Sequence, residues 1–515
     1  MIRADRDGGA GDLLILAPLA IEAAALRRAV PGARVVRAGM GPARAAEAAR
    51  RAAAAPWGAV AIVGFCGALA PDLAPGDVVV ASEVRTARGP AIPCSSGPLV
   101  AALRRLGVGR VRVGPVISTD HIVRDGQRSR IAAETGAVAV DMESAWLAAA
   151  AKGSRGDRPL AVLRVVVDAP GRELDVRRPL AAAAYGLTAY RALRRAAPAL
   201  AAWTRATGSR TVLLAGPRSF CAGVERAIEI VERALDRYGP PIYVRKQIVH
   251  NGHVVRDLER RGAVFVDALA EVPEGARCVF SAHGVSPQVR EEARGRRLTV
   301  VDATCPLVSK VHSEARRFAR AGYTIVLVGH DGHEEVEGTT GEAPDAIRLI
   351  GRAVDVPGLD LDDGERVAYL TQTTLAVDEV DEVVDALRGR FPTLVGPGSD
   401  DICYATSNRQ EAVRALARES DLMLVIGSGN SSNSQRLVEV SEREGCPARL
   451  IDDETQIDPA WLVRARTVGV TAGASAPEVL VERVVAALAG LGPVDVQERR
   501  IVPESMQFTL PIELR

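Results

Sequence analysis

Three cysteines carry the most informative chemistry in this sequence. Cys221, Cys305 and Cys403 each stand where an apolar, strand-like run gives way to a helix-like run. They lie far apart in the sequence, so only folding could bring them together. Three thiolates without a fourth partner indicate an iron–sulfur cluster with one iron left open for a substrate. A zinc site is the alternative, although zinc motifs usually pair their ligands within a few residues and no C-x-x-C occurs here.

The other four cysteines are expected to be buried thiols, because free cysteine is among the most buried residue types. These are Cys66, Cys94, Cys278 and Cys446. Residues 1–12 carry charges and glycine but no apolar core, so they do not form a secretory signal. Seven cysteines in a long chain without such a signal favour reduced thiols and a cytoplasmic location.

Two turns have the composition of anion sites. Residues 427–434 (Gly-Ser-Gly-Asn-Ser-Ser-Asn-Ser) and residues 472–477 (Ala-Gly-Ala-Ser-Ala-Pro) each follow a short apolar strand and open a helix. Hydroxyl, amide and free backbone N–H groups at a helix N-terminus form a phosphate-sized site. Either turn alone could be an ordinary helix cap. Two of them, with His250 and His283 at equivalent junctions, suggest a diphosphate ligand.

An acidic segment is a third candidate. Residues 332–339 (Gly-His-Glu-Glu-Val-Glu-Gly-Thr) are followed later by residues 371–374 (Thr-Gln-Thr-Thr). A carboxylate with a nearby hydroxyl can relay a proton into a closed pocket. A solvated acidic loop is the alternative.

The first two hundred residues carry weaker signals. Glu22 stands at a strand-to-helix junction, and residues 38–42 form a Gly-rich turn suited to phosphate or to close backbone approach. Residues 140–143 (Val-Asp-Met-Glu) precede a helix, and Asp168 ends a strand. Each of these, taken singly, is better explained as a helix cap or a solvated charge.

The elements that must position these groups alternate between strand and helix, which is the pattern of α/β domains with mostly parallel sheets. The long helical run 178–207 ends in a linker-like segment, and a fresh strand begins at Thr211. The domain boundary is therefore expected near residue 208, giving domains 1–207 and 208–515. The expected N-terminal strands are 13–17, 59–64, 77–81, 111–118 and 160–167, with helices at 42–54 and 143–152.

Composition narrows the function classes. A chain of 515 residues that is 47% hydrophobic and 25% charged is typical of a soluble globular protein with several domains. The formal net charge of +1 gives no global field that would favour nucleic acid or a membrane surface. No run reaches the length of uninterrupted apolar residues that a membrane span needs.

Residues from about 211 to 515 resemble the LytB family of 4-hydroxy-3-methylbut-2-enyl diphosphate reductases. Nine motifs occur in the family's order, among them Arg-Ser-Phe-Cys-Ala-Gly-Val, Ser-Ala-His-Gly-Val, Asp-Ala-Thr-Cys-Pro-Leu-Val, Gly-His-Glu-Glu-Val-Glu-Gly-Thr, Thr-Gln-Thr-Thr-Leu, Ile-Cys-Tyr-Ala-Thr and Asn-Ser-Ser-Asn-Ser. One departure is Ser219, where the family usually has glycine. A slightly altered turn is expected there, without loss of metal ligation.

The resemblance implies three α/β modules around one central 4Fe–4S cluster held by Cys221, Cys305 and Cys403. It implies that an allylic diphosphate is reduced to isopentenyl and dimethylallyl diphosphate in isoprenoid biosynthesis, with ferredoxin or flavodoxin as the electron donor. Glu335 would supply protons, and Thr373 would lie beside the substrate. The residues implied to contact the substrate are His250, His283, His333, Ser431, Ser432, Asn433 and Ser475.

Residues 12–200 resemble the nucleoside phosphorylase and nucleosidase superfamily, most closely its hopanoid-associated branch. The resemblance implies a three-layer α/β domain that cleaves a purine nucleoside, with adenosylhopane as one substrate. Glu22 would handle the water or ribose side, Met142 and Glu143 would hold the ribose, and Asp168 would protonate the departing purine. Residues 118–122 replace the Gly-Asp-x-Phe segment common in nucleosidases, so the aromatic contact to the base is in question.

The sequence therefore predicts a bifunctional enzyme, with nucleoside cleavage in the first domain and diphosphate reduction in the second. The alternative is the same reductase with a non-catalytic first domain that serves in docking or forms a homodimer. The choice between water and phosphate as the N-terminal nucleophile stays open.

Overall fold

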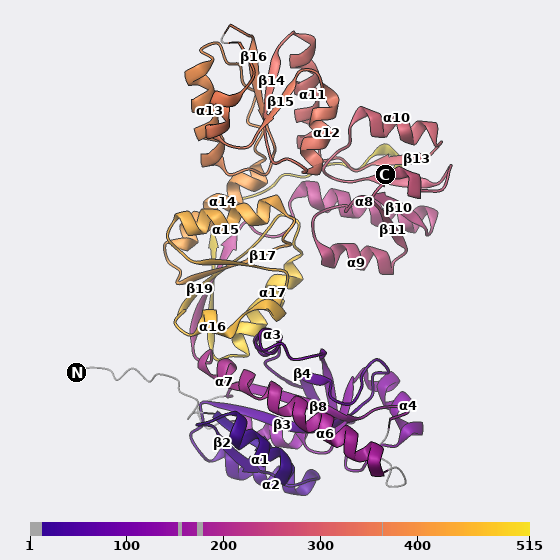
Figure 1. Cartoon of the computed structure of the whole chain (residues 1–515), viewed down its shortest axis with the longest axis vertical. Coiled ribbons are helices and arrows are strands. Elements are labelled where there is room, and N and C mark those ends of the chain that lie inside the picture. Colours follow the sequence, from indigo (N-terminus) through magenta and orange to yellow (C-terminus); the bar gives the residue numbers. More distant parts are fainter. Residues whose placement is uncertain (1–12, 153–156, 173–178, 363) are drawn as a thin grey trace, which may run out of the picture. The chain divides into compact units, whose positions relative to one another are not determined.

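The computed structural model describes residues 13–152, 157–172, 179–362 and 364–515 (Figure 1). The chain forms two compact units. The first runs to Val212 and also takes in Asp453–Arg466 and Glu482–Asp495, while the second comprises the remainder. The expected boundary near residue 208 remains a prediction, because the first unit includes these two later segments.

The first unit contains an eight-stranded sheet in the order β2-β1-β3-β7-β6-β4-β5, and β8 pairs with both β3 and β4. Strands β3, β7, β6, β4 and β8 thereby close into a ring. The bounds are β1 Leu13–Ala17, β2 Arg34–Arg37, β3 Ala59–Ala68, β4 Val78–Thr86, β5 Ile92–Pro93, β6 Val111–Ser118, β7 Ala139–Asp141 and β8 Leu160–Asp168.

Helices surround this sheet. Helix α1 packs against α6, and α2 packs against α5 and the 3₁₀ helix η2 that follows it. The helical run expected over 178–207 is two helices, since Pro198 lacks an N–H and begins a new helix. The bounds are α1 Ala20–Ala29, α2 Pro42–Ala53, α3 Gly97–Arg105, α4 Asp125–Thr135, α5 Ser144–Leu147, η2 Ala148–Ala151, α6 Pro179–Ala196, α7 Pro198–Arg205, η5 Glu454–Gln456 and α16 Pro459–Leu462.

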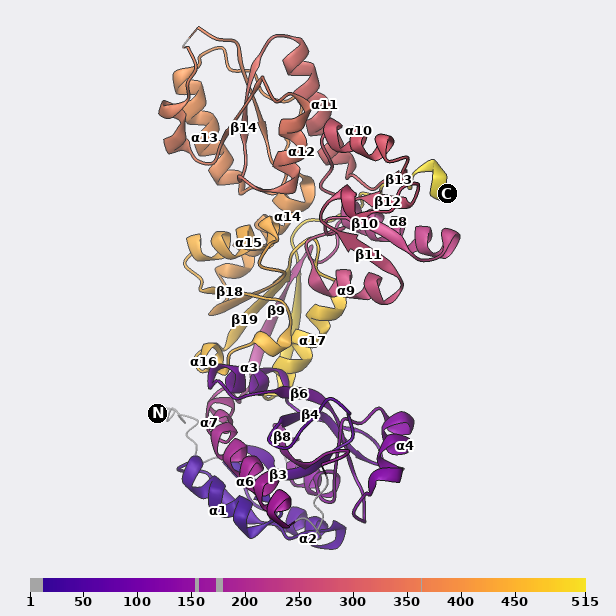
Figure 2. The same ribbon diagram turned by 45° about the vertical axis from the view of Figure 1, so that its right-hand side comes forward.

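The second unit holds three separate sheets, which are distinguishable in Figure 2. Their orders are β11-β10-β12-β13, β15-β14-β16 and β18-β17-β19-β9-β20. The bounds are β9 Arg210–Gly216, β10 Ile242–Arg245, β11 Ala263–Val266, β12 Arg277–Phe280, β13 Thr299–Asp302, β14 Thr324–Val328, β15 Ile347–Ile350, β16 Val367–Thr371, β17 Leu422–Ile426, β18 Ala448–Ile451, β19 Thr467–Ala472 and β20 Val494–Arg500.

Each of these sheets has its own apolar core and its own helices. Helix α13 covers one face of β14–β16, and α11 and α12 cover the other (Figures 1 and 2). The bounds are α8 Ala222–Tyr238, α9 Gly252–Arg260, η3 Leu269–Glu271, α10 Pro287–Gly295, α11 Pro306–Arg320, α12 Glu334–Glu342, η4 Ala353–Gly358, α13 Val377–Arg390, α14 Tyr404–Ala417, α15 Ser432–Arg443 and η6 Ile512–Leu514. Helix α17 Glu478–Ala489 begins in the second unit, and its residues from Glu482 onward belong to the first.

The strand pairs β10–β12, β14–β16 and β17–β19 are parallel. Their carboxyl ends therefore share one edge of each sheet, where ligand sites form in α/β folds. The mixed α/β fold class expected from the sequence is confirmed for both parts of the chain.

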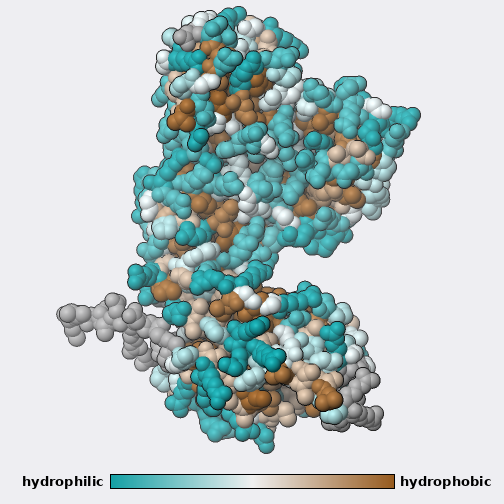
Figure 3. Space-filling model, in the orientation of Figure 1, coloured by the Kyte–Doolittle hydropathy of each residue, from teal (hydrophilic) through white to brown (hydrophobic). Residues whose placement is uncertain are grey.

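Hydrophilic residues predominate on the face shown in Figure 3. Within the described residues, no helix combines the length and apolar character needed to cross a membrane.

Candidate active sites

All three candidate ligand cysteines are helix N-caps. Cys221 precedes α8, Cys305 precedes α11 and Cys403 precedes α14. The free N–H groups and the positive end of the dipole at a helix N-terminus stabilise negative charge. This placement lowers the cost of holding a thiolate or an anionic cluster at each position.

The three thiols converge on one another. Burial raises the pKa of Cys305 to about 12, and the neighbouring Cys221 and Cys403 raise it further. Burial, with a contribution from Cys221, raises the pKa of Cys403 to about 11. Gly223 lies against this group, since a methyl at its Cα would come within 2.7 Å of Cys305 Sγ and 3.8 Å of Cys221 Sγ. A side chain at position 223 would therefore force the Cys305 thiol to shift.

A buried arginine fixes the turn that carries Cys221. Arg409 in α14 is fully buried, and its Nη2 donates to the Ser219 carbonyl at 2.7 Å. Its Nη1 pairs with Glu504 at 3.0 Å. Ser219 has a φ of +60°, which explains why glycine suits this position. Its hydroxyl donates to Glu478 at 2.6 Å, so the turn is held from two sides.

Three histidines gather beside the thiols. The rings of His250 and His283 stack with centroids 4.1 Å apart, and His333 meets them edge-on at 5.5 and 5.9 Å. Burial lowers the pKa of His250 to about 3 and that of His333 to about 4. His283 Nδ1 lies 3.2 Å from Glu334 Oε2.

The serine-rich turn opens α15 as expected. Ser431 is its N-cap and accepts from the Ser434 N–H at 3.4 Å. Among the residues that the structure describes, neither polar atom of the buried Asn433 side chain has a hydrogen-bond partner. Ser475 from the second turn donates to the His250 carbonyl at 2.9 Å. A buried, unpartnered amide beside hydroxyl groups fits a polar ligand that the pocket receives.

A buried carboxyl lines the same cavity. Glu335 is 2% exposed, and its Oε1 accepts from the Thr373 N–H at 2.7 Å while its Oε2 accepts from the Thr373 hydroxyl at 3.0 Å. Burial raises the pKa of Glu335 to about 7 despite these two hydrogen bonds. Such a group exists in both protonation states near neutral pH and can donate a proton.

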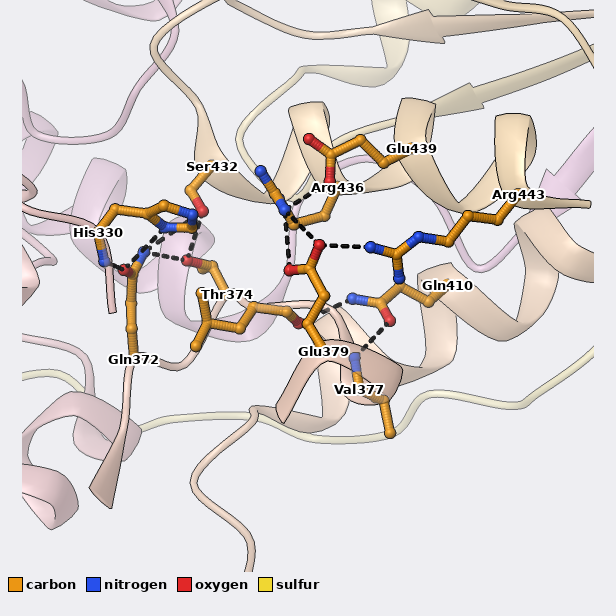
Figure 4. A network of polar contacts seen from close by, with 11 residues as sticks. His330, Gln372, Thr374, Val377, Glu379, Gln410, Ser432, Arg436, Glu439 and Arg443 are labelled. Atoms are coloured by element: carbon orange, nitrogen blue, oxygen red, sulfur yellow. Dashed lines mark hydrogen bonds and ion pairs between the residues drawn. The ribbon is translucent and has the colours of Figure 1, made fainter. Parts of the chain in front are cut away.

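A polar network joins the segments that follow β14 and β16 to the start of α15 (Figure 4). The Gln372 amide donates to Thr374 at 2.7 Å and to Ser432 at 3.3 Å, and its oxygen accepts from the His330 N–H at 3.1 Å. Further along α15, Arg436 Nη1 donates to both carboxylate oxygens of Glu379 in α13, each at 2.9 Å. These contacts fix the start of α15, where Ser432 faces the cavity.

The residues predicted for the second unit line one cavity without exception. They are Cys221, Cys305, Cys403, His250, His283, His333, Glu335, Thr373, Ser431, Ser432, Asn433 and Ser475. Gly223, Thr374, Tyr404 and Phe508 line it too, and the sequence analysis did not single them out. Gly223, Thr374 and Tyr404 stand inside motifs already noted, whereas Phe508 comes from the irregular C-terminal segment and gave no signal.

The first unit has a cavity of its own, which Glu22, Met142, Glu143 and Asp168 line together. Glu22 is 1% exposed and its carboxylate accepts from the Leu19 and Phe65 N–H groups, each at 2.7 Å. Burial raises the pKa of Glu22 and, in the same way, that of Glu143.

Charges around this cavity are paired. Arg164 is fully buried and pairs with Asp141 at 2.8 Å. Arg128 pairs with Asp168 at 2.6 Å and donates to the Ala68 carbonyl at 2.9 Å. The sequence analysis missed both arginines, because arginine is abundant throughout the chain. It also missed Phe65, an aromatic residue that lines the cavity.

The remaining cysteines largely behave as expected. Cys66, Cys278 and Cys446 are buried and free. Cys94 is free but only partly buried.

Comparisons with known proteins match the N-terminal and C-terminal parts of the chain to two different families. The family model for LytB protein matches residues 212–489, more than half of the chain. The model for the phosphorylase superfamily matches residues 31–203.

Similar proteins of known name match the C-terminal part of the chain. A 4-hydroxy-3-methylbut-2-enyl diphosphate reductase of Mycobacterium bovis is 59% identical over 314 residues, which are 60% of this chain and 95% of the relative. The enzyme of that name from Nocardia farcinica is 58% identical over 308 residues, covering 60% and 92%. A solved structure of the E-1-hydroxy-2-methyl-but-2-enyl-4-diphosphate reductase from Plasmodium falciparum matches with a TM-score of 0.58 and 37% identity, covering 60% of this chain and 97% of that one.

Proposed function

The chain belongs to the LytB protein family, and on that premise we propose that residues 208–515 reduce 4-hydroxy-3-methylbut-2-enyl diphosphate to isopentenyl and dimethylallyl diphosphate. The reaction takes two electrons and two protons and releases the substrate hydroxyl as water. The observation that carries the proposal is the single cavity in which three N-cap cysteines meet histidines, serines and a buried carboxyl. The two-domain division 1–207 and 208–515 is part of the same proposal.

The residues present fit the cofactor of the family, whose enzymes are 4Fe–4S proteins. Cys221, Cys305 and Cys403 would hold the cluster, with Gly223 leaving the space that a side chain would fill. When bound, the cluster supplies low-potential electrons and one iron open to the substrate. The three thiols must lose protons on loading, and the helix N-termini beneath them favour that charge.

The diphosphate would bind in the same cavity as the thiols. Ser431, Ser432, Asn433 and Ser475 offer hydroxyl and amide donors at two helix-opening turns, and His250, His283 and His333 add ring N–H donors. Ser432 is oriented by Gln372 at 3.3 Å, and Asn433 has no hydrogen-bond partner among the described residues. A diphosphate would satisfy these donors.

Glu335 is the proposed proton donor, with Thr373 beside the substrate. Thr373 fixes the carboxyl by two hydrogen bonds and so determines its orientation. The buried setting keeps a neutral carboxylic acid available near pH 7.

The test is anaerobic turnover of the cluster-loaded full chain with a chemical low-potential reductant, then with ferredoxin or flavodoxin. We expect both diphosphate products from wild-type protein and none from Cys305→Ser. A colourless protein without iron and labile sulfide, containing zinc instead, would defeat the proposal. Glu335→Gln should keep its iron while turnover falls by about 10²–10⁴-fold.

For the first unit we propose cleavage of the N-glycosidic bond of a purine nucleoside. The supporting observation is one cavity that joins Glu22, Met142, Glu143 and Asp168. Glu143 and Met142 would hold the ribose, and Asp168 would protonate the departing purine. Adenosylhopane is one candidate substrate.

The backbone donors favour water over phosphate as the nucleophile. Glu22 occupies the N–H groups of Leu19 and Phe65, and Glu143 occupies that of Gly41 at 3.0 Å. The Gly-rich turn at residues 38–42 therefore already holds a carboxylate where a phosphate could otherwise bind. A buried carboxyl with a raised pKa suits the role of the base that accepts a proton from water.

This second proposal is tested by adenine release from a panel of adenine nucleosides that includes adenosylhopane, with and without inorganic phosphate. We expect release without phosphate, giving free sugar, and its loss in Glu22→Gln. Phosphate-dependent release with a sugar phosphate product would contradict the assignment of water. No release from any member would favour the non-catalytic docking or homodimer domain, for which sedimentation of the full chain gives the oligomeric state.

A further inference from the structure

A cluster of metal-ligating side chains borders the cavity of the second unit, apart from the three cysteines: His250 and His283 line the cavity, and Glu334 contacts His283. His250, His283 and Glu334 each place one ligand atom within 4.8 Å of the others. His250 and His283 follow β10 and β12, and Glu334 is the first residue of α12. Because three separate turns contribute, the cluster is a product of the fold and not of local sequence.

One donor atom of the cluster has no hydrogen-bond partner in the described part of the chain, and the other two contact each other. Among the described residues, His250 Nε2 is buried without a hydrogen-bond partner. Glu334 Oε2 lies 3.2 Å from His283 Nδ1 and accepts from the Ser281 hydroxyl at 3.4 Å. When zinc binds, a proton on His283 Nδ1 must move to the other ring nitrogen, which leaves a lone pair on Nδ1 for the metal.

Two imidazole nitrogens and one carboxylate oxygen form the ligand set of open zinc sites, in which a fourth position is left to water. Bonds of about 2.1 Å in a tetrahedral arrangement separate the ligand atoms by about 3.4 Å. The closest pair here, His283 Nδ1 and Glu334 Oε2, is already 3.2 Å apart. The third ligand atom lies within 4.8 Å of these two, so it must move closer to them when zinc binds.

We propose that the substrate-free cavity binds one zinc ion through His250, His283 and Glu334, and that zinc and the allylic diphosphate exclude each other. The exclusion follows because both would use His250 and His283. The mutual exclusion of zinc and the diphosphate rests on the proposed function, whereas zinc binding does not. Zinc would thus inhibit the reductase without displacing the cluster.

The test uses the full chain with its iron–sulfur cluster in place, titrated anaerobically with zinc. We expect one zinc whose X-ray absorption spectrum shows nitrogen and oxygen ligands near 2.0–2.1 Å. The visible absorbance of the cluster should stay unchanged. Sulfur ligands near 2.3 Å with loss of cluster absorbance would place zinc on the cysteines and overturn the inference.

A matched pair of variants locates the ion. Glu334→Gln removes the anionic ligand, while Glu337→Gln removes an exposed carboxylate on the same helix. We expect the zinc dissociation constant to rise at least about tenfold in Glu334→Gln only. Equal affinity for zinc in the two variants would show that Glu334 is not a zinc ligand and would overturn the inference.

Inhibition kinetics test the exclusion. We expect zinc to raise the KM for the diphosphate in Glu337→Gln and to have little effect in Glu334→Gln. Chelation of zinc by the substrate in solution affects both variants equally, so it cancels in the comparison. If a high substrate concentration does not relieve the inhibition by zinc, the mutual exclusion is refuted, although zinc binding at the site is not. Failure of the cluster-loaded protein to reduce the diphosphate would refute the proposed function. Zinc binding would still be tested, because the X-ray absorption spectrum reports it without turnover.

Discussion

The pH dependence of turnover should report the buried carboxyl of Glu335. Burial raises its pKa from an ordinary value of 4.5 to about 7. Since the pKa of this acid is raised, the protonated form predominates below pH 7 and is lost as the pH rises through 7. About 90% of the carboxyl is protonated at pH 6 and about 10% at pH 8, so turnover limited by this proton should fall about tenfold between them.

Thr373→Val tests that assignment further. The Thr373 hydroxyl donates to Glu335 Oε2 at 3.0 Å and stabilises the carboxylate. A hydrogen bond to a charged group contributes about 1.5 kcal/mol, which corresponds to about one pKa unit. The descending limb of the pH profile should therefore move from near 7 to near 8, whatever the variant's maximal rate.

The assay is anaerobic oxidation of a chemical reductant coupled to product analysis between pH 5.5 and 9. Glu335→Gln should lose most of the activity, and its remaining turnover should no longer fall as the pH rises through 7. Wild-type turnover that stays flat over this range would refute the reasoning, as would a limb that Thr373→Val leaves in place.

Two further changes test how the cysteine site is built. Gly223→Ala places a methyl 2.7 Å from Cys305 Sγ, so we expect iron content to fall, while Gly295→Ala, whose methyl meets nothing within 4 Å, should keep its iron. Equal iron in both would show that the close approach is unimportant. Arg409→Met removes a buried cation from Glu504 and from the turn that carries Cys221, which should destabilise the second unit by about 3 kcal/mol and lower its thermal unfolding temperature. Unchanged unfolding and full iron would contradict this role.

Sequence patterns predicted the individual turns of the second unit well. Cys221, Cys305 and Cys403 were assigned to strand-to-helix junctions because apolar runs flank them, and each proves to be a helix N-cap. Their convergence on one cavity could not be derived from spacing, because it depends on how three separate sheets pack. A shared cluster was inferred from the residue type and the matching contexts of the three cysteines, and the family resemblance implied the same set.

Little in the sequence indicated the residues that support the sites through buried contacts. Arg409 is one arginine among many in the sequence, and only its burial against the Ser219 carbonyl shows its role. Arg128 was missed for the same reason, although it pairs with Asp168. Ser219 was noted as a departure, and its φ of +60° gives the physical reason why glycine is usual there.

The central claim is that Cys221, Cys305 and Cys403 hold one 4Fe–4S cluster with an iron that the substrate can reach. Mössbauer spectroscopy of the anaerobically purified full chain tests it most directly. The account predicts one iron distinct from the rest, whose signal changes when 4-hydroxy-3-methylbut-2-enyl diphosphate is added. Equivalent irons that do not respond to this substrate, or a protein without iron, would contradict it.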